Sequence, residues 1–343
     1  MIVVIRTDAT EDQVRAIVAR AVALGLEYHL SRGAERAVLI LGAGDPEEVE
    51  QAFASLPGID QLKPLTRPYR LSGREVHPQD TFVQVEGLLI GSSTPVIVAG
   101  TAAIAADPNA IETAKALHDA GASIVRTGVY RPMPVMFGAP QVDPEALQRL
   151  DGVRRESGLP VATEVLAAED VPAVARHADI LIVGAAQMHS RALLQACGWS
   201  NRPVILQRAD SAQIQEWLQV ADGLLAGGNL QILLCEQGIR TYETATRYTL
   251  DLSAVPLIRR VSHLPVIVDP SHGSGHRHLV APLALAAVAA GTHGLVLQVH
   301  GPSAPVAAEA ESTIDVGQLK HLVGEIRALT SAMAERKFSP RVR

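Results

Sequence analysis

The stretch PVIVDPSH, residues 265–272, carries a short run of apolar residues that ends in a proline turn and two polar side chains, Asp269 and His272. An uninterrupted apolar run of this length is typical of a strand buried in a parallel sheet. Similar runs recur from residue 94 onward, and intervening segments such as 277–290 have helical spacing. The eight runs are 94–100, 123–128, 160–166, 178–184, 202–208, 231–237, 265–271 and 293–300. Eight β–α repeats predict an α/β fold of the (β/α)8 TIM-barrel type.

A doubly wound open sheet is the alternative for alternating strands and helices. That fold is expected to use fewer strands and to place a glycine-rich phosphate loop after the first one. Here the first run ends in Ala99-Gly100-Thr101-Ala102, which lacks the G-x-G-x-x-G pattern. The sequence therefore favours the barrel.

The first 70 residues have a different rhythm. Strand patterns at 2–6 and 37–42 alternate with helical spacing at 10–24 and after Asp45, and Thr10 is a candidate N-terminal cap. This alternation predicts a ferredoxin-like α+β domain over residues 1–70. The polar, proline-containing residues that follow predict a linker and β-hairpin over 71–93, and the barrel then takes residues 94–343.

Composition restricts the classes of function. The chain has 343 residues, a net charge of −6 and no visible basic stripe, so we expect no nucleic-acid partner. It has no apolar run long enough for a membrane span, no secretory leader and only two cysteines, which together favour a cytoplasmic protein. An apolar barrel rim makes a homo-oligomer the expected assembly.

In a TIM barrel the chemistry lies at the carboxyl ends of the strands. The polar residues at those ends and in the loops just beyond them include Arg126, Arg131, Glu164, Gln187, Gln207, Arg208, Glu236, Gln237, Arg240, Asp269, His272 and Gln298. Several arginines near one mouth indicate an anionic ligand, because a guanidinium binds carboxylate or phosphate in a bidentate way. The alternative is that some of these arginines pair with Glu164, Glu236 or Asp269 to hold the rim, and that His272 is a rim histidine bonded to Asp269.

Several motifs together resemble one family. The stretches CEQGIRTYE at 235–243, ATRYTLDLSAVP at 245–256, DPSH at 269–272 and HGLVLQVH at 293–300 resemble type Iβ 3-deoxy-D-arabino-heptulosonate-7-phosphate (DAHP) synthase. The resemblance runs through the whole barrel and includes the N-terminal domain. It implies an enzyme that condenses phosphoenolpyruvate with erythrose 4-phosphate and uses a divalent metal.

The resemblance also assigns the metal ligands to positions in this chain. The family's cysteine after the first strand corresponds to Ala102, and its histidine is retained as His272. Its glutamate in the eighth strand corresponds to Gln298, and its aspartate falls near Glu309. A divalent site normally needs three or four good ligands. We therefore expect no cofactor, and a divalent metal only if the family's activity is retained.

The positions that hold phosphoenolpyruvate in the family differ here as well. Its cations after the fourth strand, in the fifth strand and in the C-E-R-G motif correspond to Ala186, Gln207 and Gln237. Its K-P-R-T loop keeps the first cation as Arg131, but Met133 replaces the arginine. Each lost charged contact weakens binding by about 1.5–3 kcal/mol.

These substitutions lead to a main hypothesis and two alternatives. The main hypothesis is a repurposed, metal-independent enzyme acting on a carboxylic acid of the shikimate or chorismate neighbourhood, as a lyase, an isomerase or a chorismate-mutase-type catalyst. Arg126, Arg131, Arg208 and Arg240 would anchor carboxylates, Gln207, Gln237 and Gln298 would orient the substrate, and Glu164 or His272 would act as general acid or base. The alternatives are a genuine DAHP synthase with an unusual site and a non-catalytic regulatory paralogue.

Overall fold

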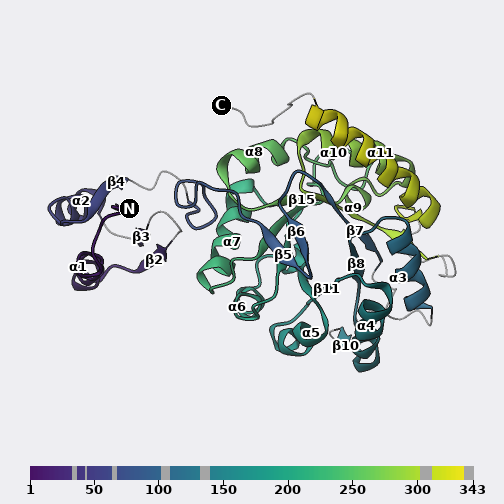
Figure 1. Ribbon diagram of the computed structural model, residues 1–343, viewed down its shortest axis with the longest axis horizontal. Helices are drawn as coiled ribbons and strands as arrows, with labels where there is room; N and C mark the ends of the chain where they lie inside the picture. The colour runs from purple at the N-terminus through teal and green to yellow at the C-terminus, as the bar shows by residue number, and fades with distance from the viewer. Residues whose placement is uncertain are drawn as a thin grey trace. The chain divides into compact units, whose positions relative to one another are not determined.

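The structure, a computed structural model, describes residues 1–32, 37–42, 45–63, 68–101, 109–131, 140–301 and 311–335. It divides into two compact units, Met1–Pro78 and Gln79–Arg343. Figure 1 shows the secondary structure of each unit.

The N-terminal unit is a four-stranded antiparallel sheet with two helices. The strands follow the order β2-β3-β1-β4, with β1 at Ile2–Ile5, β2 at Tyr28–Arg32, β3 at Ala37–Leu41 and β4 at Ile59–Lys63. Helix α1, Glu11–Ala23, begins at Thr10, which forms a capping box with Gln13. Helix α2, Pro46–Phe53, begins at Asp45. This is the expected ferredoxin-like domain.

The second unit contains a closed barrel of eight parallel strands. In chain order they are β7 (Val96–Gly100), β8 (Ile124–Thr127), β11 (Val161–Glu164), β12 (Ile180–Val183), β13 (Val204–Gln207), β14 (Ile232–Glu236), β15 (Val266–Val268) and β16 (Gly294–Leu297). Each of the eight apolar runs forms one strand, and β16 pairs with β7 to close the ring. The predicted TIM barrel is confirmed.

Helices surround this barrel (Figure 1). They are α3 (Ala110–Asp119), α4 (Pro144–Ser157), α5 (Val171–His177), α6 (Arg191–Trp199), α7 (Ile214–Ala226), α8 (Ala254–Val261), α10 (Arg277–Ala290) and α11 (Val316–Glu335). Shorter elements lie in the connections after the strands: η3 (Ala168–Asp170), η4 (Ala185–Gln187), α9 (Pro270–Ser274), and the pairs β9 (Tyr130–Arg131) with β10 (Gln141–Val142) and β17 (Val299–His300) with β18 (Ile314–Asp315). Within the described residues, no helix is long and apolar enough to cross a membrane.

The barrel interior is filled by apolar side chains, most of them branched, one or two from each strand. Val98, Ile182, Ile205, Leu233 and Ile267 belong to this core, and each is almost fully buried. A hairpin of β5 (Val83–Val85) and β6 (Leu88–Ile90) packs into the same cluster and lies across the centre of the ring in Figure 1. The backbone N–H of Thr81, just before the hairpin, donates to the carbonyl of His263, which precedes β15, so the hairpin starts at the amino-terminal end of the barrel.

Candidate active site

A layer of polar side chains lies at the carboxyl ends of the strands. Side chains alternate between the two faces of a strand, so the residue two positions after an inward core residue also points inward. The core residues Ile124, Ala162, Ile205, Cys235, Ile267 and Val296 are followed at this spacing by Arg126, Glu164, Gln207, Gln237, Asp269 and Gln298. The barrel thus brings six of the predicted polar residues to one mouth.

Arg126 lies between two carboxylates of this layer. Its Nη2 atom donates to Oε1 of Glu164 at 2.8 Å, and its Nη1 atom lies 3.7 Å from Oδ2 of Asp269. The Arg126 side chain is 11% exposed, Glu164 is 31% exposed and Asp269 is fully buried. The alternative that a mouth arginine pairs with Glu164 and Asp269 is therefore confirmed for Arg126.

Asp269 organises the loop after β15. It is the N-cap of α9, and its Oδ1 atom accepts a 2.8 Å hydrogen bond from the backbone N–H of His272. The expected contact between Asp269 and His272 thus exists through the histidine backbone. The His272 ring stacks on Tyr248, with ring centroids 5.5 Å apart and planes at 21°. Among the described residues, no donor lies within hydrogen-bonding distance of the buried Oδ2 atom of Asp269.

Amide side chains occupy the other inward positions. The carboxamide oxygens of Gln187 and Gln207 approach Gly184 at the end of β12, where an added Cβ would lie 3.0 and 3.7 Å from them. Gln298 is buried, and its Oε1 atom accepts a 2.5 Å hydrogen bond from Ser312. These amides supply hydrogen bonds without charge.

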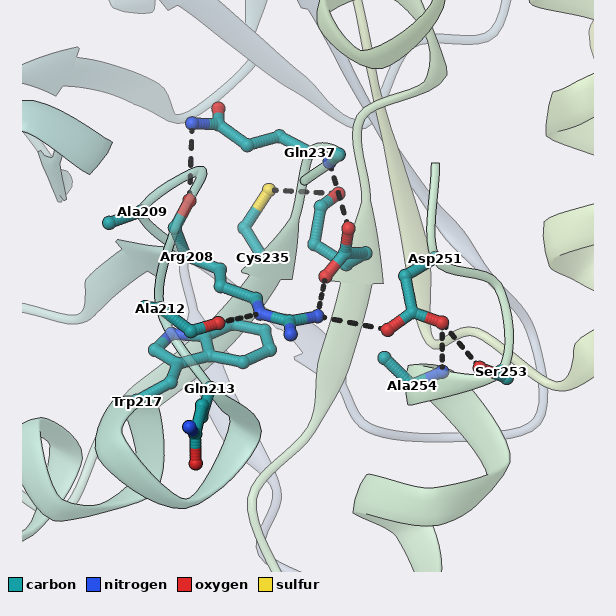
Figure 2. A network of polar contacts seen from close by, with 12 residues as sticks. Arg208, Ala209, Ala212, Gln213, Trp217, Cys235, Gln237, Asp251, Ser253 and Ala254 are labelled. Atoms are coloured by element: carbon teal, nitrogen blue, oxygen red, sulfur yellow. Dashed lines mark hydrogen bonds and ion pairs between the residues drawn. The ribbon is translucent and has the colours of Figure 1, made fainter. Parts of the chain in front are cut away.

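Arg208 lies on the opposite side of the strand wall. Its Nη1 atom donates to Glu236 at 2.8 Å and to Asp251 at 3.1 Å, and its Nε atom donates to the carbonyl of Ala212 (Figure 2). The guanidinium lies 6.0 Å from the ring centroid of Trp217 on α7. Figure 2 shows Gln237 extending away from this guanidinium. Because side chains alternate along a strand and Gln207 points inward, Arg208 faces away from the inward layer that contains Arg126.

The charges of this outer cluster are tuned by burial. Burial raises the pKa of Glu236, although Arg208 and the backbone N–H of Gly238 favour its ionised form. Partial burial also opposes ionisation of Asp251. Hydrogen bonds from Ser253 and Arg208 outweigh that effect and lower the pKa of Asp251.

The remaining predicted cations lie outside the buried layer. Arg131 pairs with Asp143 at 3.1 Å and is 60% exposed, and Arg240 pairs with Asp210 at 2.9 Å and is 74% exposed. Ala186 lies exposed on η4. Ala102, Met133 and Glu309 fall outside the described residues.

Sequence reasoning missed three contributors to the site. Asp251 precedes α8 in the motif Asp-Leu-Ser, a spacing typical of a helix start, and this signal was available in the sequence. Tyr248 and Ser312 have no such signal. They act through contacts between loops distant in sequence, with His272 and Gln298 respectively.

A closed (β/α)8 barrel with a ferredoxin-like domain and charged groups at its carboxyl-terminal mouth defines a TIM-barrel protein with the usual location of an enzyme site. The DAHP synthetase I family matches residues 76–335, and the DAHP synthase ferredoxin-like domain matches residues 1–67. The chain belongs to the DAHP synthetase I family.

Individual relatives agree with this membership. The phospho-2-dehydro-3-deoxyheptonate aldolase of Thermotoga maritima is 38% identical over 97% of this chain and 98% of the relative. A crystal structure of that DAHP synthase has a TM-score of 0.75, at 37% identity and 97% coverage of both chains. The 2-dehydro-3-deoxyphosphooctonate aldolase of Acidithiobacillus ferrooxidans is 28% identical over 71% of this chain and 92% of the relative.

Two expectations from the sequence are wrong. The main hypothesis of a repurposed enzyme of the shikimate or chorismate neighbourhood is overturned by the 38% identity to a DAHP synthase over nearly the whole of both chains. The expectation of no cofactor is overturned by membership in a family that depends on a divalent metal. Both errors came from reading substitutions at single positions as loss of the reaction.

The described residues do not by themselves complete a metal site. His272 is in place, but the Oε1 atom of Gln298 already accepts a hydrogen bond from Ser312. Within the described ranges, no group of three or more His, Cys, Asp or Glu side chains could hold an ion.

Proposed function

We propose that this chain is a DAHP synthase, which condenses phosphoenolpyruvate and erythrose 4-phosphate. The observation that carries the proposal is the similarity to the Thermotoga maritima enzyme, which extends over both domains at 38% identity. The mouth of the barrel supports it, because Arg126 lies there with two carboxylates and a histidine close by.

The reaction joins two substrates and releases phosphate. The C3 carbon of phosphoenolpyruvate attacks the aldehyde carbon of erythrose 4-phosphate and forms the new C–C bond. Water adds to C2, its C–O bond to the phosphate breaks, and inorganic phosphate leaves. Arg126 is suited to bind the substrate carboxylate through its forked N–H groups. Glu164, 2.8 Å from Arg126 and partly exposed, is placed to accept a proton from the attacking water.

The amide side chains in the polar layer affect the affinity for phosphoenolpyruvate. Gln207 and Gln237 can donate hydrogen bonds to phosphate oxygens but add no positive charge. A hydrogen bond to a charged group contributes about 1.5–3 kcal/mol, more than a neutral one. We therefore expect weaker binding of phosphoenolpyruvate than a site with cations at these positions would give.

Steady-state assays of the full chain test the proposal. Phosphate release and formation of the seven-carbon product are measured with both substrates, with Mn²⁺ added and with a chelator. Arg126→Lys removes the forked donor but keeps the charge, so kcat/KM should fall by at least tenfold, in line with the loss of about one charge-assisted hydrogen bond. Arg149→Lys, on the outer helix α4, should leave it unchanged. Absence of product from the wild-type chain at high concentrations of both substrates would overturn the proposal.

A further inference from the structure

We infer that Arg126 changes partners when substrate binds: Asp269 is its permanent anchor, and Glu164 is the carboxylate that an incoming substrate carboxylate displaces. The inference rests on the proposed function only for the identity of that substrate, phosphoenolpyruvate. It makes Asp269 a positioning residue for Arg126.

The two carboxylates hold Arg126 differently. Glu164 makes the close contact, 2.8 Å from Nη2, yet 31% of its side chain is exposed. Asp269 makes the longer contact, 3.7 Å from Nη1, and is fully buried. The stronger partner is therefore the one that can turn toward water.

Asp269 has no comparable freedom. Its Oδ1 atom is held by the backbone N–H of His272 at the start of α9, and Pro270 follows it directly. Its Oδ2 atom is buried without a hydrogen-bond donor among the described residues. A buried carboxylate oxygen that accepts no hydrogen bond is stabilised by a nearby positive charge. For Asp269 that charge is the guanidinium of Arg126, 3.7 Å away.

The charge of the layer indicates which partner leaves. Its described inward side chains are one arginine, two carboxylates and three amides, so the layer carries one excess negative charge. A bound substrate carboxylate would place three anions around one guanidinium in a poorly solvated mouth. Like charges at such distances repel strongly. Because Asp269 is fixed, Glu164 must move away from Arg126.

Glu164 is then a competitor of the substrate as well as a possible proton acceptor. Glu164→Gln removes the competing charge, so the dissociation constant of phosphoenolpyruvate should fall, by about tenfold for one charge-assisted hydrogen bond. The same substitution should lower kcat. A side chain with only a structural role would not raise the affinity for phosphoenolpyruvate while lowering kcat.

Calorimetric titration with phosphoenolpyruvate tests this exchange. Glu164→Gln should bind more tightly than wild type, and Glu169→Gln, at an exposed position on η3 after the same strand, should not. Asp269→Asn keeps the cap but removes the anchor, so it should bind more weakly. Glu164→Gln should then have a smaller effect in the Asp269→Asn background, because two anions instead of three surround Arg126 when substrate is bound. Unchanged or weaker binding by Glu164→Gln would overturn the inference.

A second measurement does not depend on the substrate. Phenylglyoxal modifies arginine, and mass spectrometry reports the rate at Arg126 alone. Release from Glu164 should raise that rate in Glu164→Gln, while Glu169→Gln should leave it at the wild-type value. If wild type fails to bind phosphoenolpyruvate but this difference is seen, the proposed function is wrong and the partner exchange stands. If the labelling rates are equal, the exchange is wrong.

Discussion

The Nη1 atom of Arg208 lies 2.8 Å from Oε2 of Glu236, and both side chains are buried. The pair joins neighbouring strands, β13 and β14, and the same nitrogen lies 3.1 Å from Asp251 ahead of α8. Arg208 therefore supports the strand wall and the loop that follows β14 (Figure 2). Arg126, on β8, belongs to the inward polar layer and faces the mouth instead.

Removal of Arg208 should reduce stability and leave substrate affinity nearly unchanged. Arg208→Met leaves Glu236 as an unpaired buried carboxylate, which costs about 3–5 kcal/mol. Urea unfolding measures this loss, and the exposed Arg155→Met is the matched control. A tenfold rise in the KM for phosphoenolpyruvate, without loss of stability, would instead identify Arg208 as a substrate ligand.

The pH dependence of stability should report Asp251. Its pKa in the folded chain is lowered below the ordinary value of 3.8, so its contribution to stability is present above 3.8 and is lost as the pH falls through the folded pKa. Asp251→Asn removes that contribution. The difference in unfolding free energy between wild type and Asp251→Asn should be largest near neutral pH and shrink below 3.8. A difference that stays constant with pH would exclude the ionised carboxylate as its source.

Gln207→Lys should strengthen binding of phosphoenolpyruvate. The amide points into the mouth, and the layer around it has an excess negative charge that favours an added cation. One charged hydrogen bond to phosphate corresponds to about a ten- to hundredfold lower dissociation constant. Gln195→Lys, which adds the same charge on the exposed face of α6, is the control. Equal effects of the two variants would show that Gln207 does not contact the phosphate.

Gln298→Glu should strengthen binding of a divalent ion. It replaces a neutral oxygen with a carboxylate on β16, and Ser312 can still donate to it. Mn²⁺ titration followed by electron paramagnetic resonance should show at least about tenfold tighter binding, the range found for changes around a metal ligand. Gln195→Glu serves as the surface control. His272→Ala is then combined with Gln298→Glu. If Mn²⁺ binding stays as tight as in Gln298→Glu alone, residues 298 and 272 do not share one ion.

The fold could be predicted from the sequence because burial leaves a direct pattern. Most residues of the barrel strands are apolar on both faces, so a strand such as Ile180–Val183 appears as an unbroken apolar run. The strands Tyr28–Arg32 and Ile59–Lys63 were not recognised, because they mix polar and apolar residues in a small sheet.

The site was predicted less well, because the partner of a charged residue depends on three-dimensional contacts. The alternation rule could have separated Gln207, facing the mouth, from Arg208, facing outward. The sequence could not reveal that Glu164 and Asp269 share Arg126, since three different strands bring them together. Substitutions such as Gln298 indicate altered affinity, but whether the reaction is kept depends on the whole mouth.

The central claim is tested most directly by identifying the product of the full-length chain. Phosphoenolpyruvate labelled with ¹³C at C2 and C3 is incubated with erythrose 4-phosphate and Mn²⁺, and the mixture is followed by ¹³C and ³¹P nuclear magnetic resonance. The account predicts that the label appears in the seven-carbon DAHP with release of one inorganic phosphate per molecule formed. Persistence of both substrates, or phosphate release without the new C–C bond, would contradict it.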